Sequence, residues 1–104
     1  MVRGEIWWAD LPRPAGRHPV LLLSRDRAIE IRHFVTVAQV TSTIRDIPVE
    51  VKLGPKDGMP KACAANLDVI NTIPKDLLSH RVCALSPHKM SEVEEALKFA
   101  LGID

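Results

Sequence analysis

The sequence has few aromatic residues and few cysteines. Two tryptophans and two phenylalanines are its only aromatic residues, and it has no tyrosine. No apolar run approaches the roughly 20 residues of a membrane-spanning helix. The two cysteines, Cys63 and Cys83, are too few for a zinc site built from spaced cysteine pairs. The sequence permits a disulfide between them but does not require one. Both lie in short apolar runs, so we interpret them as small core residues.

Targeting signals are also missing. Arg3 is followed by Gly4 and Glu5 rather than by an apolar leader segment, and free cysteines suit a reducing compartment. We therefore expect a cytoplasmic protein with no membrane association. The length of 104 residues predicts a single domain over 1–104. Its 46% hydrophobic residues suffice for a core that needs no disulfide bonds or bound metals.

Patterns for metal and phosphate chemistry are lacking as well. The four histidines have no paired spacing, and no acidic pair resembles a metal-ligand motif. The five glycines are scattered singly, so no phosphate-binding loop is present, and no G-x-S-x-G nucleophile motif occurs. We predict no metal site and no cofactor. A serine–histidine–acid arrangement stays open at this point.

Charge is nearly balanced overall but unevenly distributed. Residues 1–45 hold seven arginines and four acids, a balance of +3, whereas residues 46–104 hold seven basic and nine acidic residues, a balance of −2. Arginine suits bidentate contacts with phosphate. An ordinary solvated surface explains the same distribution, and on charge alone we favour that explanation.

The apolar pattern predicts about six short strands followed by one helix. The final segment has apolar residues on one helical face, a start at Ser86–Pro87 or at Ser91, and an end at Gly102. Segment 24–33 is interpreted as a loop that can hold a helical turn, and segment 74–79 as one helical turn. The predicted strands are 4–9, 19–24, 34–40, 47–53, 61–70 and 81–85. This order predicts a mainly β fold, a small SH3-like curved antiparallel sheet or open barrel with a C-terminal helix.

Polar residues with catalytic potential lie beside the predicted strands. Arg17 and His18 precede the second strand, Thr41 to Thr43 follow the third, and Asn66 and Asp68 lie in or beside the fifth. Each has a plain structural explanation, as a surface residue or as a side chain that bonds the local backbone. Taken singly, none of them indicates a function.

The order of several segments is more specific than any one of them. The chain reads "RGEIWWADLP", "HPVLLLSRD", "VTVAQVTSTIR", "IPVEVKL", "NLDVINTIP" and "LSPHKMSEVEEALKFALGI". In this order they resemble the MazF/PemK family of toxins over nearly the whole chain. The resemblance implies a plasmid-maintenance-toxin barrel that forms a homodimer and cuts single-stranded RNA at short sequences without a metal. It also implies an antitoxin partner that covers the RNA groove with an extended acidic segment.

The resemblance also implies residue roles. The reaction is attack by the ribose 2′-hydroxyl on the adjacent phosphorus, which needs proton transfer and positive charge. Thr41 matches the family's threonine after the third strand, and Asp68 matches an acidic position that can accept a proton or orient an arginine. Asn66 stands where some members carry a basic residue. The predicted RNA-binding residues are Ser42, Thr43, Arg25, Arg45 and Asn66.

The chain departs from the family pattern before Pro19. Members usually have arginine directly before this proline, whereas this chain has His18 there and Arg17 one residue earlier. Neighbouring residues of an extended segment point to opposite sides, so only one of the two is expected to face the phosphate. Either His18 serves as the acid–base group, since imidazole titrates near neutrality, or Arg17 bends into the site.

Two other functions remain open from the sequence. One is a gyrase poison of the CcdB kind, which shares the fold but is not an enzyme. Members of that family end on Trp-Gly-Ile, whereas this chain ends Leu101-Gly102-Ile103-Asp104 without the tryptophan. The other is a barrel that binds RNA but has lost catalysis, which the departure at His18 keeps open.

Overall fold

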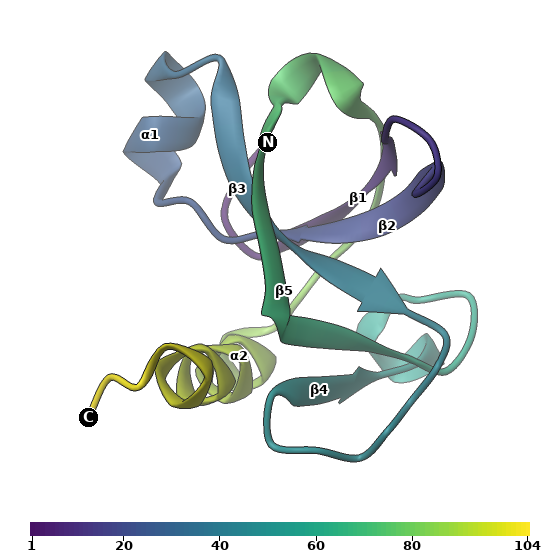
Figure 1. The fold of residues 1–104 in the computed structure, drawn as a ribbon, viewed down its shortest axis with the longest axis vertical. Coiled ribbons are helices and arrows are strands. Elements are labelled where there is room, and N and C mark those ends of the chain that lie inside the picture. The colour runs from purple at the N-terminus through teal and green to yellow at the C-terminus, as the bar shows by residue number, and fades with distance from the viewer.

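The protein folds around one six-stranded antiparallel sheet, as described by a computed structural model of residues 1–104. The strand order is β4-β5-β3-β2-β1-β6, and a C-terminal helix packs on the lower half of the sheet (Figure 1). The strands are β1 (Glu5–Asp10), β2 (Arg17–Leu22), β3 (Phe34–Thr41), β4 (Glu50–Leu53), β5 (Cys63–Pro74) and β6 (Leu78–Ala84). The helices are α1 (Asp26–Ile31), α2 (Pro87–Leu101) and the short 3₁₀ turns η1 (Pro55–Asp57) and η2 (Lys75–Leu77). The predicted mainly β fold with a terminal helix is confirmed.

Strand β5 is bent and holds the two halves of the sheet together. Its first part pairs with both β4 and β3, and its second part pairs with β3 alone. Between them the register shifts, so that Gln39 of β3 faces Asn66 while the preceding Ala38 faces Ile70. The extra residues of β5 form a bulge, which bends a strand and increases its twist. Figure 1 shows the resulting change of direction in β5 near α2.

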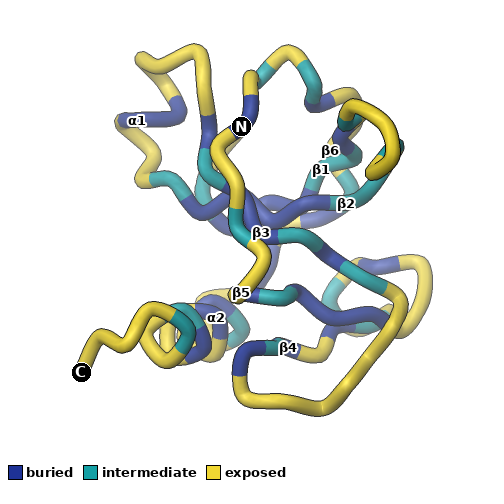
Figure 2. Tube along the Cα trace, viewed as in Figure 1, coloured by how far each residue is buried: buried dark blue, intermediate teal, exposed yellow.

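Two apolar clusters fill the two halves of the fold, and Figure 2 shows buried residues along the chain in both halves. One lies between the sheet and α2 and includes Leu21, Val40 and Val93. The other lies among β1, β2, β3 and α1 and includes Val20 and Ile29. Neighbouring residues of β2 therefore serve opposite clusters, which explains why its apolar run is continuous rather than alternating. No helix of the structure has the length and apolar character required to cross a membrane.

The terminal helix begins at the first of its two predicted starts. The Ser86 side chain accepts a hydrogen bond from the Lys89 N–H at 3.1 Å, and Pro87 is the first helical residue. Gly102 ends the helix with φ of 70°, a left-handed conformation that glycine adopts without strain. The predicted helix over 87–101 is thus confirmed.

Several predicted boundaries were wrong. Segment 24–33 contains the six-residue helix α1, and β2 begins at Arg17 rather than at Pro19 because Arg17 and His18 pair with β1. The fourth strand covers only 50–53, since the chain before it forms a loop. Segment 74–79 has one 3₁₀ turn as expected, but the chain enters β6 at Leu78, which pairs with Ala9 and is buried.

The N-terminal segment is held by a buried carboxylate. Glu5 accepts hydrogen bonds from the Val2 N–H at 2.9 Å, the Trp7 indole at 3.1 Å and the Arg81 guanidinium at 3.3 Å. Burial pushes the pKa of Glu5 upward, but these donors and the nearby N-terminal ammonium outweigh it and hold the pKa below its ordinary value. The ionised form of Glu5 therefore stabilises the fold.

Candidate active site

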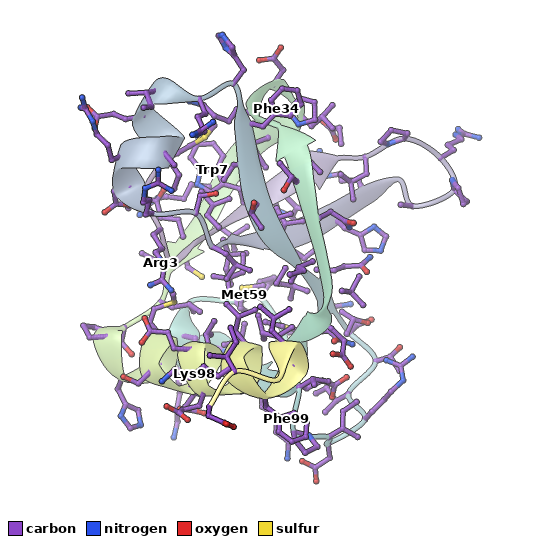
Figure 3. All side chains as sticks on the ribbon, turned by 60° about the vertical axis from the view of Figure 1, so that its left-hand side comes forward. Arg3, Trp7, Phe34, Met59, Lys98 and Phe99 are labelled. Atoms are coloured by element: carbon purple, nitrogen blue, oxygen red, sulfur yellow. The ribbon has the colours of Figure 1, made fainter.

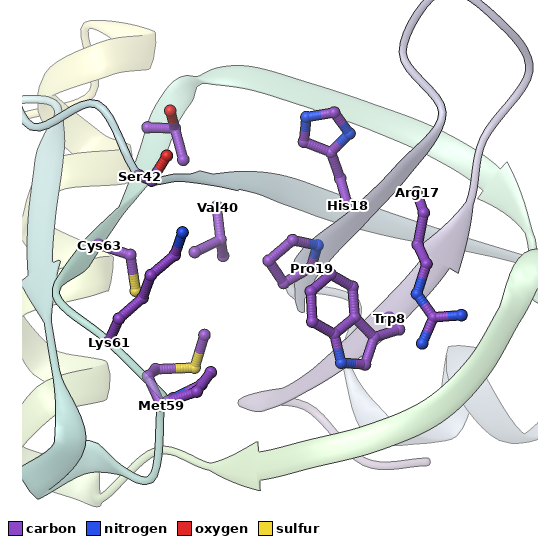
Figure 4. Close-up of a pocket in the computed structure, with 11 residues that line it drawn as sticks. Trp8, Arg17, His18, Pro19, Val40, Ser42, Met59, Lys61 and Cys63 are labelled. Atoms are coloured by element: carbon purple, nitrogen blue, oxygen red, sulfur yellow. The ribbon is translucent and has the colours of Figure 1, made fainter.

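A hollow of about 240 Å³ opens where β2 begins and β3 ends (Figure 4). Its floor and lower walls are apolar and come from Pro19, Val40, Met59 and Cys63. Trp8 of β1 closes one side. Its polar rim consists of Arg17, His18, Thr41, Ser42 and Lys61, none of which is a carboxylate.

Arg17 and His18 lie on opposite faces of β2. Arg17 pairs with Asp10 of β1 and His18 with Ala9, so their side chains alternate across the strand. The Arg17 guanidinium carbon lies 4.9 Å from the centre of the Trp8 ring, and its Nη1 is 4.0 Å from Asp10 Oδ1. Figure 4 shows the two side chains pointing apart. The predicted divergence of Arg17 and His18 is thus what the structure shows.

His18 and Thr41 line the same hollow, one at the start of β2 and the other at the end of β3. The β2–β3 ladder ends at the pair Val20–Gln39, so the two strands carry His18 and Thr41 just beyond their last paired residues. His18 is half-buried, and its Nδ1 is buried without a hydrogen-bond partner. This leaves Nε2 as the ring nitrogen for contact with a ligand.

The Thr41 hydroxyl is oriented by the loop that follows it. Its Oγ1 accepts a hydrogen bond from the Thr43 N–H at 3.1 Å, so its own proton is available to donate elsewhere. Ser42 is exposed at the rim of the hollow. Thr43 contributes to the site through its backbone rather than through its side chain.

The other predicted site residues are not gathered at the hollow. Asn66 faces Gln39 on the adjacent strand, and its Oδ1 accepts from the Asp68 N–H at 2.9 Å. Asp68 lies in the β5 bulge, is exposed and does not line the hollow. Arg25 follows the far end of β2 and lines a separate depression beside α1. Arg45 lies in the loop after β3, with Nη1 3.7 Å from Glu50 Oε2.

Trp8 and Lys61 line the hollow, and sequence reasoning missed both. The tandem Trp7-Trp8 carried a usable signal, because two neighbouring residues of a strand cannot both face one core. Lys61 had no such signal in the sequence, since its position at the hollow depends on β5 starting beside the end of β3. In Figure 4 Lys61 extends along the wall of the hollow from the segment that carries Met59.

The Met59–Lys61 segment is fixed by Gly58. This residue has φ of +100°, and a Cβ at this position would lie 2.6 Å from Cys83 Cβ. Only glycine allows this approach. The Sγ of Cys83 is 3.6 Å from the sulfur of Met59, so the segment packs closely on β6.

The chemistry of the hollow is that of hydroxyls, an imidazole and cations. Burial, and secondarily the charge of Asp57, raises the pKa of the Cys63 thiol, so this cysteine is an apolar wall residue at neutral pH rather than a nucleophile. No group of three or more His, Cys, Asp or Glu side chains is placed to hold a metal ion.

A curled antiparallel sheet with a terminal helix and a polar site at its strand ends defines the class of small toxin barrels. The chain belongs to the family of PemK-like, MazF-like toxins of type II toxin–antitoxin systems, whose model matches residues 2–101.

Individual relatives agree with this assignment. The chain is 38% identical over 100 residues to the "Probable endoribonuclease MazF5" of Mycobacterium tuberculosis, covering 95% of this chain and 91% of the relative. It is 34% identical over 103 residues to the "Probable endoribonuclease MazF2" of the same species, covering 98% and 99%.

Solved structures show the same fold. A mycobacterial endoribonuclease in complex with its cognate antitoxin superposes with a TM-score of 0.89 at 31% identity, covering 100% of this chain and 97% of that one. The Mycobacterium tuberculosis toxin MazF-mt6 superposes with a TM-score of 0.88 at 28% identity, covering 96% and 98%. The predicted family, fold and endoribonuclease class are confirmed.

Proposed function

We propose that this toxin cuts single-stranded RNA by attack of a ribose 2′-hydroxyl on the adjacent phosphorus, without a metal ion. The observation that carries the proposal is that one hollow is lined by His18, by the hydroxyl residues Thr41 and Ser42, and by the cations Arg17 and Lys61. These groups can move a proton and stabilise negative charge, which is what the reaction requires.

The proton transfers are assigned to His18. Its Nε2 takes the proton of the 2′-hydroxyl as the 2′-oxygen bonds to phosphorus, and the bond to the 5′-oxygen breaks. The imidazolium then gives the proton to the departing 5′-oxygen. The products are a 2′,3′-cyclic phosphate on one fragment and a 5′-hydroxyl on the other.

Charge stabilisation is assigned to groups around His18. The Thr41 hydroxyl donates to a non-bridging oxygen of the reacting phosphate, and the Lys61 ammonium supplies positive charge from across the hollow. Arg17 contacts a neighbouring phosphate from the Trp8 side. Asp68 does not line the hollow, so no step of this reaction is assigned to it.

The test is cleavage of a long RNA in the presence of EDTA. We expect cutting to persist and the downstream product to carry a 5′-hydroxyl, which polynucleotide kinase labels without prior phosphatase treatment. Thr41→Ala serves as the inactive control, and a gyrase supercoiling assay tests the gyrase-poison alternative. Cleavage that EDTA abolishes and Mg²⁺ restores would refute the mechanism, whereas RNA binding without cleavage would favour the inactive barrel.

We further propose a cytoplasmic homodimer. The end of α2 and the residues after it expose Phe99, Leu101 and Ile103, at 64%, 53% and 55%, and Figure 3 shows Phe99 pointing away from the sheet. The sheet also leaves the outer edges of β4 and β6 unpaired. A second copy covers such surfaces symmetrically. We expect a dimer by light scattering at micromolar concentration and a monomer for Phe99→Glu; a fully active monomeric parent would contradict this.

The partner of this dimer is proposed to be an antitoxin with a disordered acidic segment. A structure similar to this chain, a mycobacterial endoribonuclease, was solved in complex with its cognate antitoxin. The positive charges of Arg17 and Lys61 at the hollow suit an acidic segment as well as RNA. A peptide of this kind should therefore compete with RNA for the site.

A further inference from the structure

Glu50 on β4 has an almost completely buried carboxylate. Its side chain is 1% exposed, although Lys52, the next residue on the same face of β4, is exposed. Burying a carboxylate is costly unless donors satisfy it. The donors at Glu50 come from the loop 42–49, which joins β3 to β4 and follows Thr41 directly.

Two consecutive backbone amides of this loop bind the same carboxylate oxygen. Glu50 Oε1 accepts from the Arg45 N–H at 2.8 Å and from the Asp46 N–H at 3.1 Å. Glu50 Oε2 is buried without a hydrogen bond, and the nearest cation is Arg45 Nη1 at 3.7 Å. Asp46 has φ of +58°, a left-handed conformation that a non-glycine residue keeps only when its surroundings hold it.

The same loop reaches the site through Thr43. The Thr43 N–H donates to Thr41 Oγ1 at 3.1 Å, two residues before the first amide held by Glu50. A hydroxyl rotates freely unless a partner fixes it. The Thr43 amide occupies the acceptor side of Thr41 and so directs its proton away from the loop.

We propose that Glu50 is a positioning residue, which clamps the loop 42–49 and thereby orients the Thr41 hydroxyl and presents Ser42 and Arg45 to RNA. The catalytic part of this inference rests on the proposed function. The clamp itself does not, because the order of the loop is measurable in the RNA-free protein.

A purely structural role for Glu50 makes a different prediction. If the carboxylate only supports β4, its loss lowers the free energy of unfolding but leaves the kcat of the folded protein unchanged. Glu5 offers a matched control, because it is a second buried and hydrogen-bonded carboxylate that lies outside the site. Glu5→Gln should destabilise the protein with no change in kcat.

The first measurement is amide hydrogen exchange by NMR on the full-length protein without RNA. Glu50→Ala should speed exchange at Thr43, Arg45 and Asp46 relative to the parent and to Glu5→Gln. Glu50→Gln should speed it less, because an amide oxygen can still accept both N–H groups. Unchanged exchange at these amides in Glu50→Ala would overturn the clamp, whether or not the protein cuts RNA.

The second measurement is kcat and KM at a temperature far below the unfolding midpoint of every variant. Glu50→Ala should lower kcat by about tenfold to a hundredfold, as expected for a misplaced catalytic group, and Glu50→Gln should recover most of it. In the double variant with Thr41→Ala, the two losses should not add. Independent, additive losses or an unchanged kcat would refute the link to Thr41. A parent that cuts no RNA would instead refute the proposed function.

Discussion

Alanine replacements at positions 17 and 18 distinguish the roles of Arg17 and His18. The stability cost of Arg17→Ala is small, because its exposed contact with Trp8 contributes about 0.5–1 kcal/mol and its exposed ion pair with Asp10 about 0–1 kcal/mol. His18 is half-buried and its buried Nδ1 has no partner, so His18→Ala breaks no hydrogen bond of the fold through that nitrogen. Both variants should therefore fold, and their activities can be compared directly.

The two activities should fall for different reasons. Removing a general acid–base group costs about 10²–10⁴ in rate, so His18→Ala should show this loss in kcat with little change in RNA binding. Arg17→Ala should mainly weaken binding. If Arg17 neutralises one phosphate, the slope of log K against log salt should become shallower by about 0.7, the value for one contact on a single strand.

The assay combines single-turnover cleavage with binding to an RNA that carries a 2′-deoxy residue at the cut site. Arg27→Ala is the matched control, since this arginine pairs with Glu30 on α1, away from the hollow. If the two variants exchange phenotypes, Arg17 is the group at the phosphate. If both cut like the parent, neither belongs to the site. A large gain in the double variant R17H/H18R would identify the natural chain as an attenuated enzyme.

Three further predictions concern single side chains. Thr41→Ala should lower kcat by about 100-fold or more while changing stability by no more than about 1 kcal/mol, and kinetics together with urea unfolding check both; equal rates would remove Thr41 from the site. Lys61→Ala should lower kcat/KM and reduce the salt dependence of binding, whereas Lys56→Ala, on the 3₁₀ turn η1 outside the hollow, should do neither. Glu5→Gln should lower the thermal midpoint at neutral pH but matter progressively less in acid. The pKa of Glu5 is lowered on folding, so its contribution is fully present above the ordinary value of 4.5 and is lost as the pH falls through the folded value. A difference in thermal midpoint between parent and Glu5→Gln that stays constant with pH would contradict this.

The fold was readable from the sequence where local signals were strong. The continuous apolar run of β2 and the capped, one-sided pattern of α2 predicted those elements. The start of β2 was missed because Arg17 and His18 carry no strand signal of their own, and only their pairing with β1 makes them strand residues. Segment 24–33 was expected to be a loop with room for a helical turn, and the six residues of helix α1 were not predicted because only Ala28 and Ile29 of them are buried.

The site was only partly readable. Thr41 could be placed through the family resemblance, and the alternation of an extended chain correctly separated Arg17 from His18. Lys61 could not be found, because it comes to the hollow through a strand start that lies far from Thr41 in the sequence. Glu50 is one of the polar residues that alternate with valines in "IPVEVKL", a pattern that places it on the exposed face, and it is the loop over it that buries the carboxylate.

The glycine before Met59 has a consequence for laboratory evolution of this toxin. Because a side chain at Gly58 would collide with Cys83, random substitution there would displace the whole Met59–Lys61 wall at once. Substitutions at Met59, Pro60 and Lys61 themselves would instead reshape the hollow one side chain at a time. A library aimed at new cleavage preferences should therefore keep Gly58 and Cys83 constant and diversify Met59, Pro60 and Lys61.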